Sequence, residues 1–258
     1  MVFAQFIQFF INGLMGGAIY ALIAIGIVSI FKATKVVNFA HGYIIMFGAY
    51  FYYTFSVIIP GLDWMPEWLL SWEPRWLVEW SGNLPMFSPL SSLADWIKNI
   101  PRIILGISGA LICNSILGLL IERFLMRPLM GQSSFSMIMV TVGLISVLSG
   151  LANLIWTADA DFVPYISPNA PIRISFFGAT IFIFSSDLIN VLIALILFAL
   201  VVGSVKYFKS GIAIRATAED QSTAYSMGIS VPKVFAGAWW LASLTGAMAG
   251  VILATRNG

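Results

Sequence analysis

Uncharged, apolar runs alternate with short charged segments along this chain of 258 residues. An α-helix needs about 20 residues to cross a hydrocarbon layer of about 30 Å, so an uncharged run of this length predicts a membrane-spanning helix. We therefore expect an all-α polytopic membrane protein with about six transmembrane helices, in one domain over residues 1–258. The runs cover residues 1–31, 36–62, 103–121, 128–158, 188–205 and 234–255.

Composition agrees with this pattern. Hydrophobic residues make up 60% of the chain and charged residues only 9%, whereas soluble domains are usually about 45–50% apolar and about 25% charged. The single cysteine, Cys113, lies in the third run, where we expect it to be a small buried hydrophobe. The net charge of +2 gives no support for nucleic-acid binding.

Basic residues concentrate on alternate connections between the runs. The connections after runs one, three and five hold eight basic and three acidic residues, and the remaining connections hold five basic and eight acidic ones. Because Lys and Arg resist translocation, the basic side is predicted to be cytoplasmic and the N-terminus external. The eight basic residues are Lys32, Lys35, Arg123, Arg127, Lys206, Lys209, Arg215 and Lys233.

Two segments are predicted on the external side. The first, residues 61–101, contains tryptophans at every fourth position from Trp64 to Trp80, which favours either a helix lying on the membrane surface or a docking surface for an external partner. The second, residues 159–186, alternates apolar and polar residues on both sides of Gly178. That alternation predicts a small β-hairpin.

The runs contain no Asp, Glu, Lys or Arg, which disfavours a proton-coupled carrier because such carriers usually bury ionisable groups. The chain also lacks a G-x-x-x-x-G-K-[ST] phosphate loop and a G-x-S-x-G elbow, and its one histidine and one cysteine cannot form a zinc site. We therefore predict that it is not an enzyme. Any work it performs must be powered by another protein.

The segment "GIAIRATAEDQSTAYSMG" stands out as polar between two apolar runs. Its residues favour a helix, and Gly228 is a typical helix stop. We predict a short cytoplasmic helix over residues 211–229, just before the last run. The residues alone leave open whether it is an ordinary solvated helix or a docking element.

Three segments resemble one family, the branched-chain amino acid permeases of ABC importers in bacteria and archaea. They are "RATAEDQSTAYSMGI", "NGLMGGAIYALIAIGIVSIFKATKVVNFAHG" and "IERFLMRPLMG". The resemblance implies a multi-pass plasma (inner) membrane subunit that couples to cytoplasmic ATPases through residues 211–229. It points to Arg215, Ala218, Glu219, Asp220 and Gly228 as the coupling residues, although Ser222-Thr223-Ala224 departs from the usual Glu-Ala-Ala pattern of importers.

The same resemblance implies the partners of the chain. These are ATPase subunits that bind ATP and Mg²⁺, a second permease subunit of similar or identical sequence, an external solute-binding protein and membrane lipid. This chain itself is expected to hold no cofactor and no metal. Family members continue past the sixth run, so we expect further segments to follow or another subunit to complete the pathway.

Candidate pathway residues lie in three runs. In "VVNFAHG", Asn38 either caps the following helix or lines the cytoplasmic mouth of the pathway together with His41. A polar stripe in the fourth run and two polar residues in the third either face solute or form interhelical hydrogen bonds. These residues are Thr141, Ser146, Ser149, Asn114 and Ser115.

The function expected from this reading is ATP-driven import of leucine, isoleucine, valine or related amino acids. Urea or a short amide is the alternative substrate, because related permeases carry those solutes. A passive small-solute channel is the alternative from another class.

Overall fold

The computed structural model describes residues 2–61, 88–156, 163–176 and 179–257, and the Trp64 to Trp80 ladder lies outside them. The long elements are α1 (Val2–Thr34), α2 (His41–Tyr53), α5 (Ser88–Ile121), α6 (Ser134–Ile155), α7 (Ser185–Tyr207) and α10 (Val231–Asn257). The shorter helical segments are η1 (Thr54–Ile58), η2 (Ile59–Gly61), η3 (Glu122–Met126), η4 (Arg127–Leu129), α8 (Lys209–Glu219) and α9 (Gln221–Ser226). The strands are β1 (Pro171–Phe176) and β2 (Ala179–Phe184).

Within the described residues, five helices are long and apolar enough to cross a membrane. They fall within Gln5–Thr34, Asn99–Leu129, Ser134–Ile155, Ser185–Tyr207 and Val231–Arg256. The all-α polytopic fold is therefore confirmed. The helix that contains the third run begins earlier than the run itself, at Ser88.

The second predicted run, residues 36–62, is not among these five helices and has a different local structure. Its first residues are not helical: the helix begins only at His41, and α2 continues through a π-helical turn and a 3₁₀ turn to Gly61. Lys35 has a positive φ of 59°, so the chain turns immediately after α1 instead of continuing as a helix. The segment 35–40 thus forms a short connection between α1 and α2 in which exposed and buried residues alternate.

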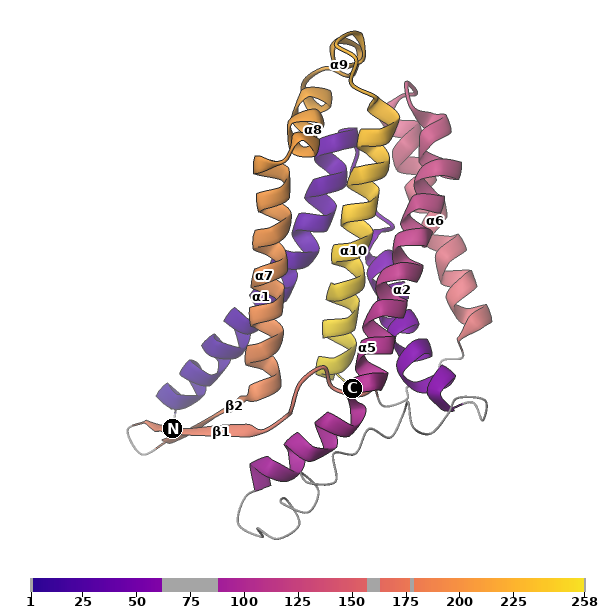
Figure 1. The fold of residues 1–258 in the computed structure, drawn as a ribbon. Coiled ribbons are helices and arrows are strands. Elements are labelled where there is room, and N and C mark those ends of the chain that lie inside the picture. Colours follow the sequence, from indigo (N-terminus) through magenta and orange to yellow (C-terminus); the bar gives the residue numbers. More distant parts are fainter. Residues whose placement is uncertain (1, 62–87, 157–162, 177–178, 258) are drawn as a thin grey trace.

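α10 lies at the centre of the helix bundle and contacts α1, α2 and α5 (Figure 1). In its most apolar window 61% of the residues are buried, against 17% in that of α7. Small residues permit this. A Cβ on Gly250 would collide with the carbonyl oxygen of Ile45, and one on Gly48 would lie 2.6 Å from the Cα of Ala247. The backbones of α2 and α10 are therefore in close contact, as small residues allow in membrane helices.

The molecule has two distinct ends. One end carries α8 and α9, and the opposite end carries both termini and the β-hairpin (Figure 1). The predicted hairpin is confirmed: β1 and β2 pair antiparallel, with Ile174 opposite Ile181. Gln8 of α1 fastens the hairpin to the bundle, because its side chain donates to the Phe182 carbonyl at 2.7 Å and accepts from the Phe182 N–H at 2.9 Å.

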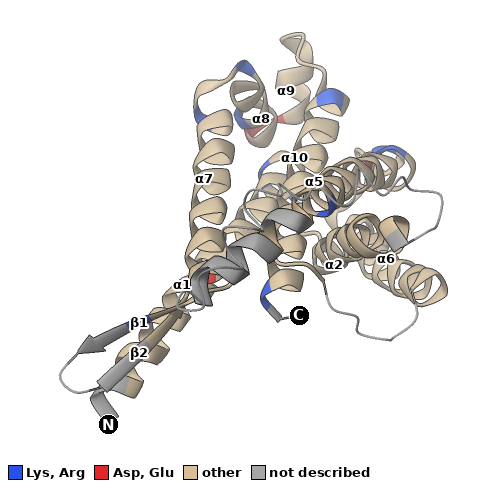
Figure 2. Ribbon diagram, turned by 60° about the horizontal axis from the view of Figure 1, so that its bottom comes forward, with Lys and Arg blue, Asp and Glu red and all other residues tan. Residues whose placement is uncertain are grey.

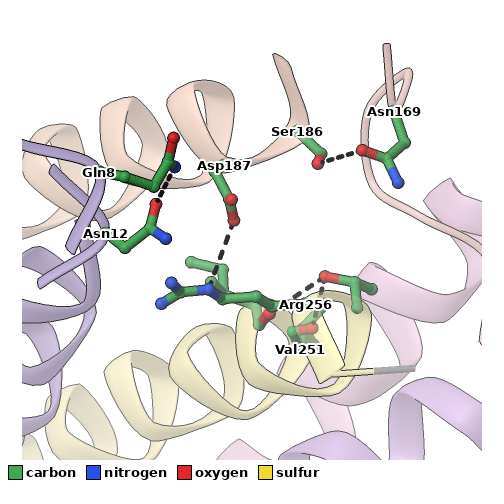
Figure 3. A network of polar contacts seen from close by, with 9 residues as sticks. Gln8, Asn12, Asn169, Ser186, Asp187, Val251 and Arg256 are labelled. Carbon is green, nitrogen blue, oxygen red and sulfur yellow. Dashed lines mark hydrogen bonds and ion pairs between the residues drawn. The ribbon is translucent and has the colours of Figure 1, made fainter. Parts of the chain in front are cut away.

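Polar contacts also join the helices at the hairpin end (Figure 3). Asp187 in the first turn of α7 forms an ion pair with Arg256 in the last turn of α10, with 3.3 Å between Oδ1 and Nε. Each charge lies at the helix end where the helix dipole favours its sign. Figure 2 shows that charged residues gather mainly at helix ends and connections; Arg102, inside α5, is an exception.

The close approach of α2 and α10 yields a stability prediction. A Gly250→Ala substitution places a methyl carbon against the Ile45 carbonyl and 2.8 Å from the Ala49 nitrogen. We expect a loss of about 1 to 3 kcal/mol from overpacking, more than the gain of about 1 kcal/mol in helix propensity. Thermal unfolding of the purified protein in detergent measures this as a melting temperature lowered by several degrees.

Gly143→Ala in α6 is the matched control, because nothing lies within 4 Å of a Cβ at that position. This variant should melt at or slightly above the wild-type temperature. Equal melting temperatures for the two alanine variants would contradict the close contact.

Candidate functional site

The predicted coupling segment forms two helices that we call the α8–α9 unit (Lys209–Gly228). It begins with a tight turn after α7, made possible by Gly211: a Cβ there would collide with the carbonyl of Val205. Arg215 then donates from Nη1 to the same Val205 carbonyl oxygen at 3.1 Å. These two contacts fold α8 back against the end of α7.

The inner face of α8 is attached to the bundle through apolar contacts. Ile214 is buried in one cluster with Ala33 of α1 and with Val231, Phe235 and Ala238 of α10. Thr217 is also buried, and its hydroxyl donates to carbonyl oxygens within α8. α8 therefore contacts α1, α7 and α10 at once. A displacement of α8 would act on all three helices.

The prediction of one continuous helix is wrong, because the chain breaks at Asp220. This residue is extended (φ −150°, ψ 120°) and caps α9: its Oδ1 accepts from the backbone N–H groups of Ser222 at 2.7 Å and Thr223 at 2.9 Å. Oδ1 also accepts from the Ser222 hydroxyl at 2.6 Å. The Ser-Thr pair that departs from the importer pattern is thus what Asp220 binds.

These hydrogen bonds favour the charged form of Asp220. The Ser222 hydroxyl, followed by the backbone N–H groups of Thr223 and Ser222, lowers the pKa of the carboxyl group below its ordinary value of 3.8. The cap is therefore present at neutral pH and is lost only when the pH falls through that lowered pKa.

The predicted helix stop at Gly228 is confirmed. Gly228 has a φ of +83° and its N–H donates to the Tyr225 carbonyl at 3.0 Å, while the N–H of Ile229 donates to the Ala224 carbonyl at 3.0 Å. This is the Schellman arrangement, which satisfies the last carbonyls of a helix. The chain can then turn directly into α10.

The outer surface of the unit combines charge with exposed apolar side chains. Arg215, Glu219 and Asp220 are exposed, and Ala218 is half-buried. Tyr225 and Met227, at the C-terminal end of α9, are also 72% and 78% exposed. Sequence reasoning missed these two residues, although their position after the acidic pair was visible. This end of the unit therefore presents two large exposed side chains close to its exposed charges.

The structure places Asn38 and His41 in the interior, with 3% and 1% of their surfaces exposed. Asn38 accepts from the Ala40 N–H at 3.0 Å through Oδ1, but the N-cap residue of α2 is Ala40. Asn38 therefore stabilises a turn before the helix and does not cap it. His41 packs so closely on α1 that a Cβ on Gly26 would lie 2.7 Å from its Nε2.

The other candidate pathway residues do not form one stripe. On α6, Thr141 is buried, Ser149 is half-buried and Ser146 is exposed. Thr141 and Ser146 lie about 140° apart around the helix at 100° per residue. On α5, Asn114 is buried and donates from Nδ2 to the Ser243 carbonyl of α10 at 2.8 Å, while Ser115 is half-buried. Asn114 thus makes an interhelical hydrogen bond.

One small cavity brings two of the candidates together. Asn38 and Thr141 both line it, alongside Trp239 and Phe235 of α10. Within the described part of the chain, Asn38 Nδ2 and Trp239 Nε1 are buried donors without a hydrogen-bond partner. Buried donors usually have partners, and this cavity of about 10 Å³ has room for one water as the acceptor. The described residues include no group of His, Cys, Asp or Glu that could hold a metal ion.

Long apolar helices around a central helix, with a polar two-helix unit at one end, define a multi-pass membrane protein. The chain belongs to the branched-chain amino acid transport system / permease component family, whose model matches residues 9–258.

Curated relatives agree with this assignment. The permease protein LivH of a high-affinity branched-chain amino acid transport system in Salmonella typhimurium is 26% identical over 262 residues, covering 97% of this chain and 71% of LivH. LivH of Escherichia coli K12 has the same identity and coverage. BraD of Pseudomonas aeruginosa, a permease of the same kind of system, is 25% identical over 98% of this chain and 72% of its own length. No solved structure matches the chain.

The capping role of Asp220 can be tested by hydrogen exchange. Asp220→Ala removes the acceptor for the Ser222 and Thr223 amides, so these amides should exchange several-fold faster at neutral pH as the first turn of α9 frays. Glu219→Ala is the control, because it removes a neighbouring exposed carboxylate and leaves the cap intact.

The pH dependence gives a second readout. The amide chemical shifts of Ser222 and Thr223 should titrate with a midpoint below 3.8, because Asp220 has a lowered pKa. A midpoint at or above 3.8 would show that the hydrogen bonds to Asp220 do not form.

Proposed function

We propose that this chain is the permease subunit of an ABC importer that moves branched-chain or related amino acids inward across the plasma membrane of a bacterium or archaeon. The substrate class is supported by the names of the related permeases. Separate ATPase subunits would bind ATP and Mg²⁺ and supply the energy, and an external solute-binding protein would deliver the amino acid. The end that carries the α8–α9 unit would face the cytoplasm, which leaves the N-terminus and the hairpin outside.

The observation that carries the proposal is the two-sided character of the α8–α9 unit. Its tip exposes Glu219, Tyr225 and Met227 to water. Its base is buried against α1, α7 and α10 through the Ile214 cluster. An ATPase that engages the tip would therefore move three spanning helices, because the base is packed too closely to slide independently. We assign Arg215 and Gly228 to the geometry of the unit and Ala218, Glu219 and Asp220 to its contact surface.

The same packing supports a route from the unit to the solute. Phe235 is buried with Ile214 in the cluster at the base of α8, and it also lines the cavity that Asn38, Thr141 and Trp239 share. A movement of α8 would shift Phe235 and so alter this cavity. We propose that the cavity lies beside the pathway and that the unpaired donors of Asn38 and Trp239 bind a water there, because its volume of about 10 Å³ holds no amino acid.

A second permease subunit, similar or identical, would complete the pathway. α6 and α7 carry many exposed apolar side chains, among them Leu154 of α6 and Leu200 of α7 at 83% and 63% exposure. These surfaces suit either lipid or another permease helix. Ser146 would then face the second subunit, because it is exposed on the surface of this one.

Co-purification of the ATPase tests the role of the unit. Glu219→Lys combined with Tyr225→Ala and Met227→Ala alters the exposed tip and keeps the Asp220 cap. We expect this variant to fold normally and to lose most of the ATPase retained by the wild type, with at least a tenfold fall in leucine uptake by cells.

Lys35→Glu is the control, since it reverses an exposed charge outside the α8–α9 unit. It should retain the ATPase. If the tip variant keeps both the ATPase and uptake, the unit is not the coupling element. Leucine flux that persists without any ATPase would instead support a passive channel.

A further inference from the structure

A basic groove lies beside the α8–α9 unit, between α1, α7 and α8. Three cationic side chains line it, one from each helix: Lys32 of α1, Lys206 of α7 and Arg215 of α8. The remaining lining residues are Ser29 and the apolar residues Ile25, Val28, Val202, Val205 and Ile214. No Asp or Glu lines the groove, so its three cationic residues have no carboxylate among the lining residues.

The position of the cations along the spans fixes the depth of the groove. Lys32 lies in the last turn of α1 and Lys206 in the last turn of α7. Both helices are membrane-spanning, so the two ammonium groups lie at the level where a bilayer changes from acyl chains to headgroups. The helix dipole favours one lysine at each helix end, but it does not explain why Arg215 of a third helix joins them.

The apolar part of the groove continues toward the membrane interior. Ile25 and Val28 precede Lys32 by one to two turns of α1, and Val202 precedes Lys206 by one turn of α7. Val28 and Val202 are 42% and 38% exposed, so this surface is open beside the chain. The groove thus has a cationic rim at the headgroup level and an apolar floor below it.

We propose that this groove binds an anionic glycerophospholipid. The phosphate would lie between Lys32, Lys206 and Arg215, and one acyl chain would cover Ile25, Val28 and Val202. Cationic pockets between spanning helices are suited to such headgroups. A bound phosphate would also relieve the repulsion between the three cations. Because the groove includes Arg215 and Ile214, the lipid would hold α8 against α1 and α7 and so steady the base of the α8–α9 unit.

Charge complementarity favours an anionic lipid over a zwitterionic lipid or a second copy of the chain. A zwitterionic lipid fits the apolar floor but brings its own cation to the rim. A second copy of the chain would need to present an acidic side chain at headgroup depth. An anionic lipid satisfies the rim and the floor together and is present in the surrounding membrane.

The binding can be measured on the purified full chain in detergent by native mass spectrometry. The probes are a phosphatidylglycerol and a phosphatidylcholine with the same acyl chains, each titrated separately. We expect phosphatidylglycerol to bind more tightly than phosphatidylcholine, and Lys32→Gln with Lys206→Gln to weaken phosphatidylglycerol binding on the order of tenfold. Lys32→Arg with Lys206→Arg should restore it.

Lys35→Gln with Arg123→Gln is the matched control, because it removes the same charge from exposed residues outside the groove. Equal weakening in both double variants would overturn the proposal, as would equal binding of the two lipids. The proposal would also be overturned if free inorganic phosphate, at the same concentration as the lipid, displaced phosphatidylglycerol, because the groove would then be a simple anion site.

A second measurement uses the unaltered protein and does not depend on how the variants fold. A photoactivatable phosphatidylglycerol should label residues 25–32 of α1 and 202–206 of α7. Labelling confined to other helices, or a groove covered by a second copy of the chain in cross-linking, would contradict the assignment. Neither readout involves the ATPase, so this inference and the proposed transport function can fail separately.

Discussion

The contact between α2 and α10 is the constraint on which the bundle depends. Gly48 and Gly250 lie directly against the backbone of the facing helix, so neither position has room for a side chain. α5 approaches α10 in a similar way, because a Cβ on Gly118 would collide with the Ser243 hydroxyl. In a membrane there is little hydrophobic drive between helices, and close packing of this kind supplies the attraction instead. α10 can be central because small residues let its neighbours reach it.

A central α10 also explains how a unit at one end could influence the interior. The first turns of α10 carry Val231 and Phe235, which pack with Ile214 of α8. One turn further on, Trp239 lines the cavity shared with Asn38 and Thr141. The interface and the cavity are therefore adjacent sections of one rigid helix. Packed side chains of this kind transmit displacement, because protein interiors compress very little.

Arg215 differs in its contacts from the two lysines that line the basic groove. Arg215 binds the Val205 carbonyl and also lines the basic groove, so it belongs to both the turn that shapes the unit and the groove beside it. Lys32 and Lys206 line the groove but do not take part in the turn that shapes the unit. A chain that is only 9% charged thus gathers three cations where three helices meet. The proposed lipid would connect membrane composition to the stability of the α8 base.

The sequence alone was enough to predict five spanning helices, the hairpin and the helix stop at Gly228, because each depends on local composition or on the conformation of one residue. It also carried the family resemblance, through segments that match in order. Tertiary structure decided the rest. The break at Asp220 depends on a cap that competes with helix continuation. The burial of Asn38 and the separation of Thr141 from Ser146 depend on which helix faces meet, since apolar runs in a membrane protein do not reveal their inward side. The groove forms only where α1, α7 and α8 come together, and the pattern of a single helix does not reveal which other helices it meets.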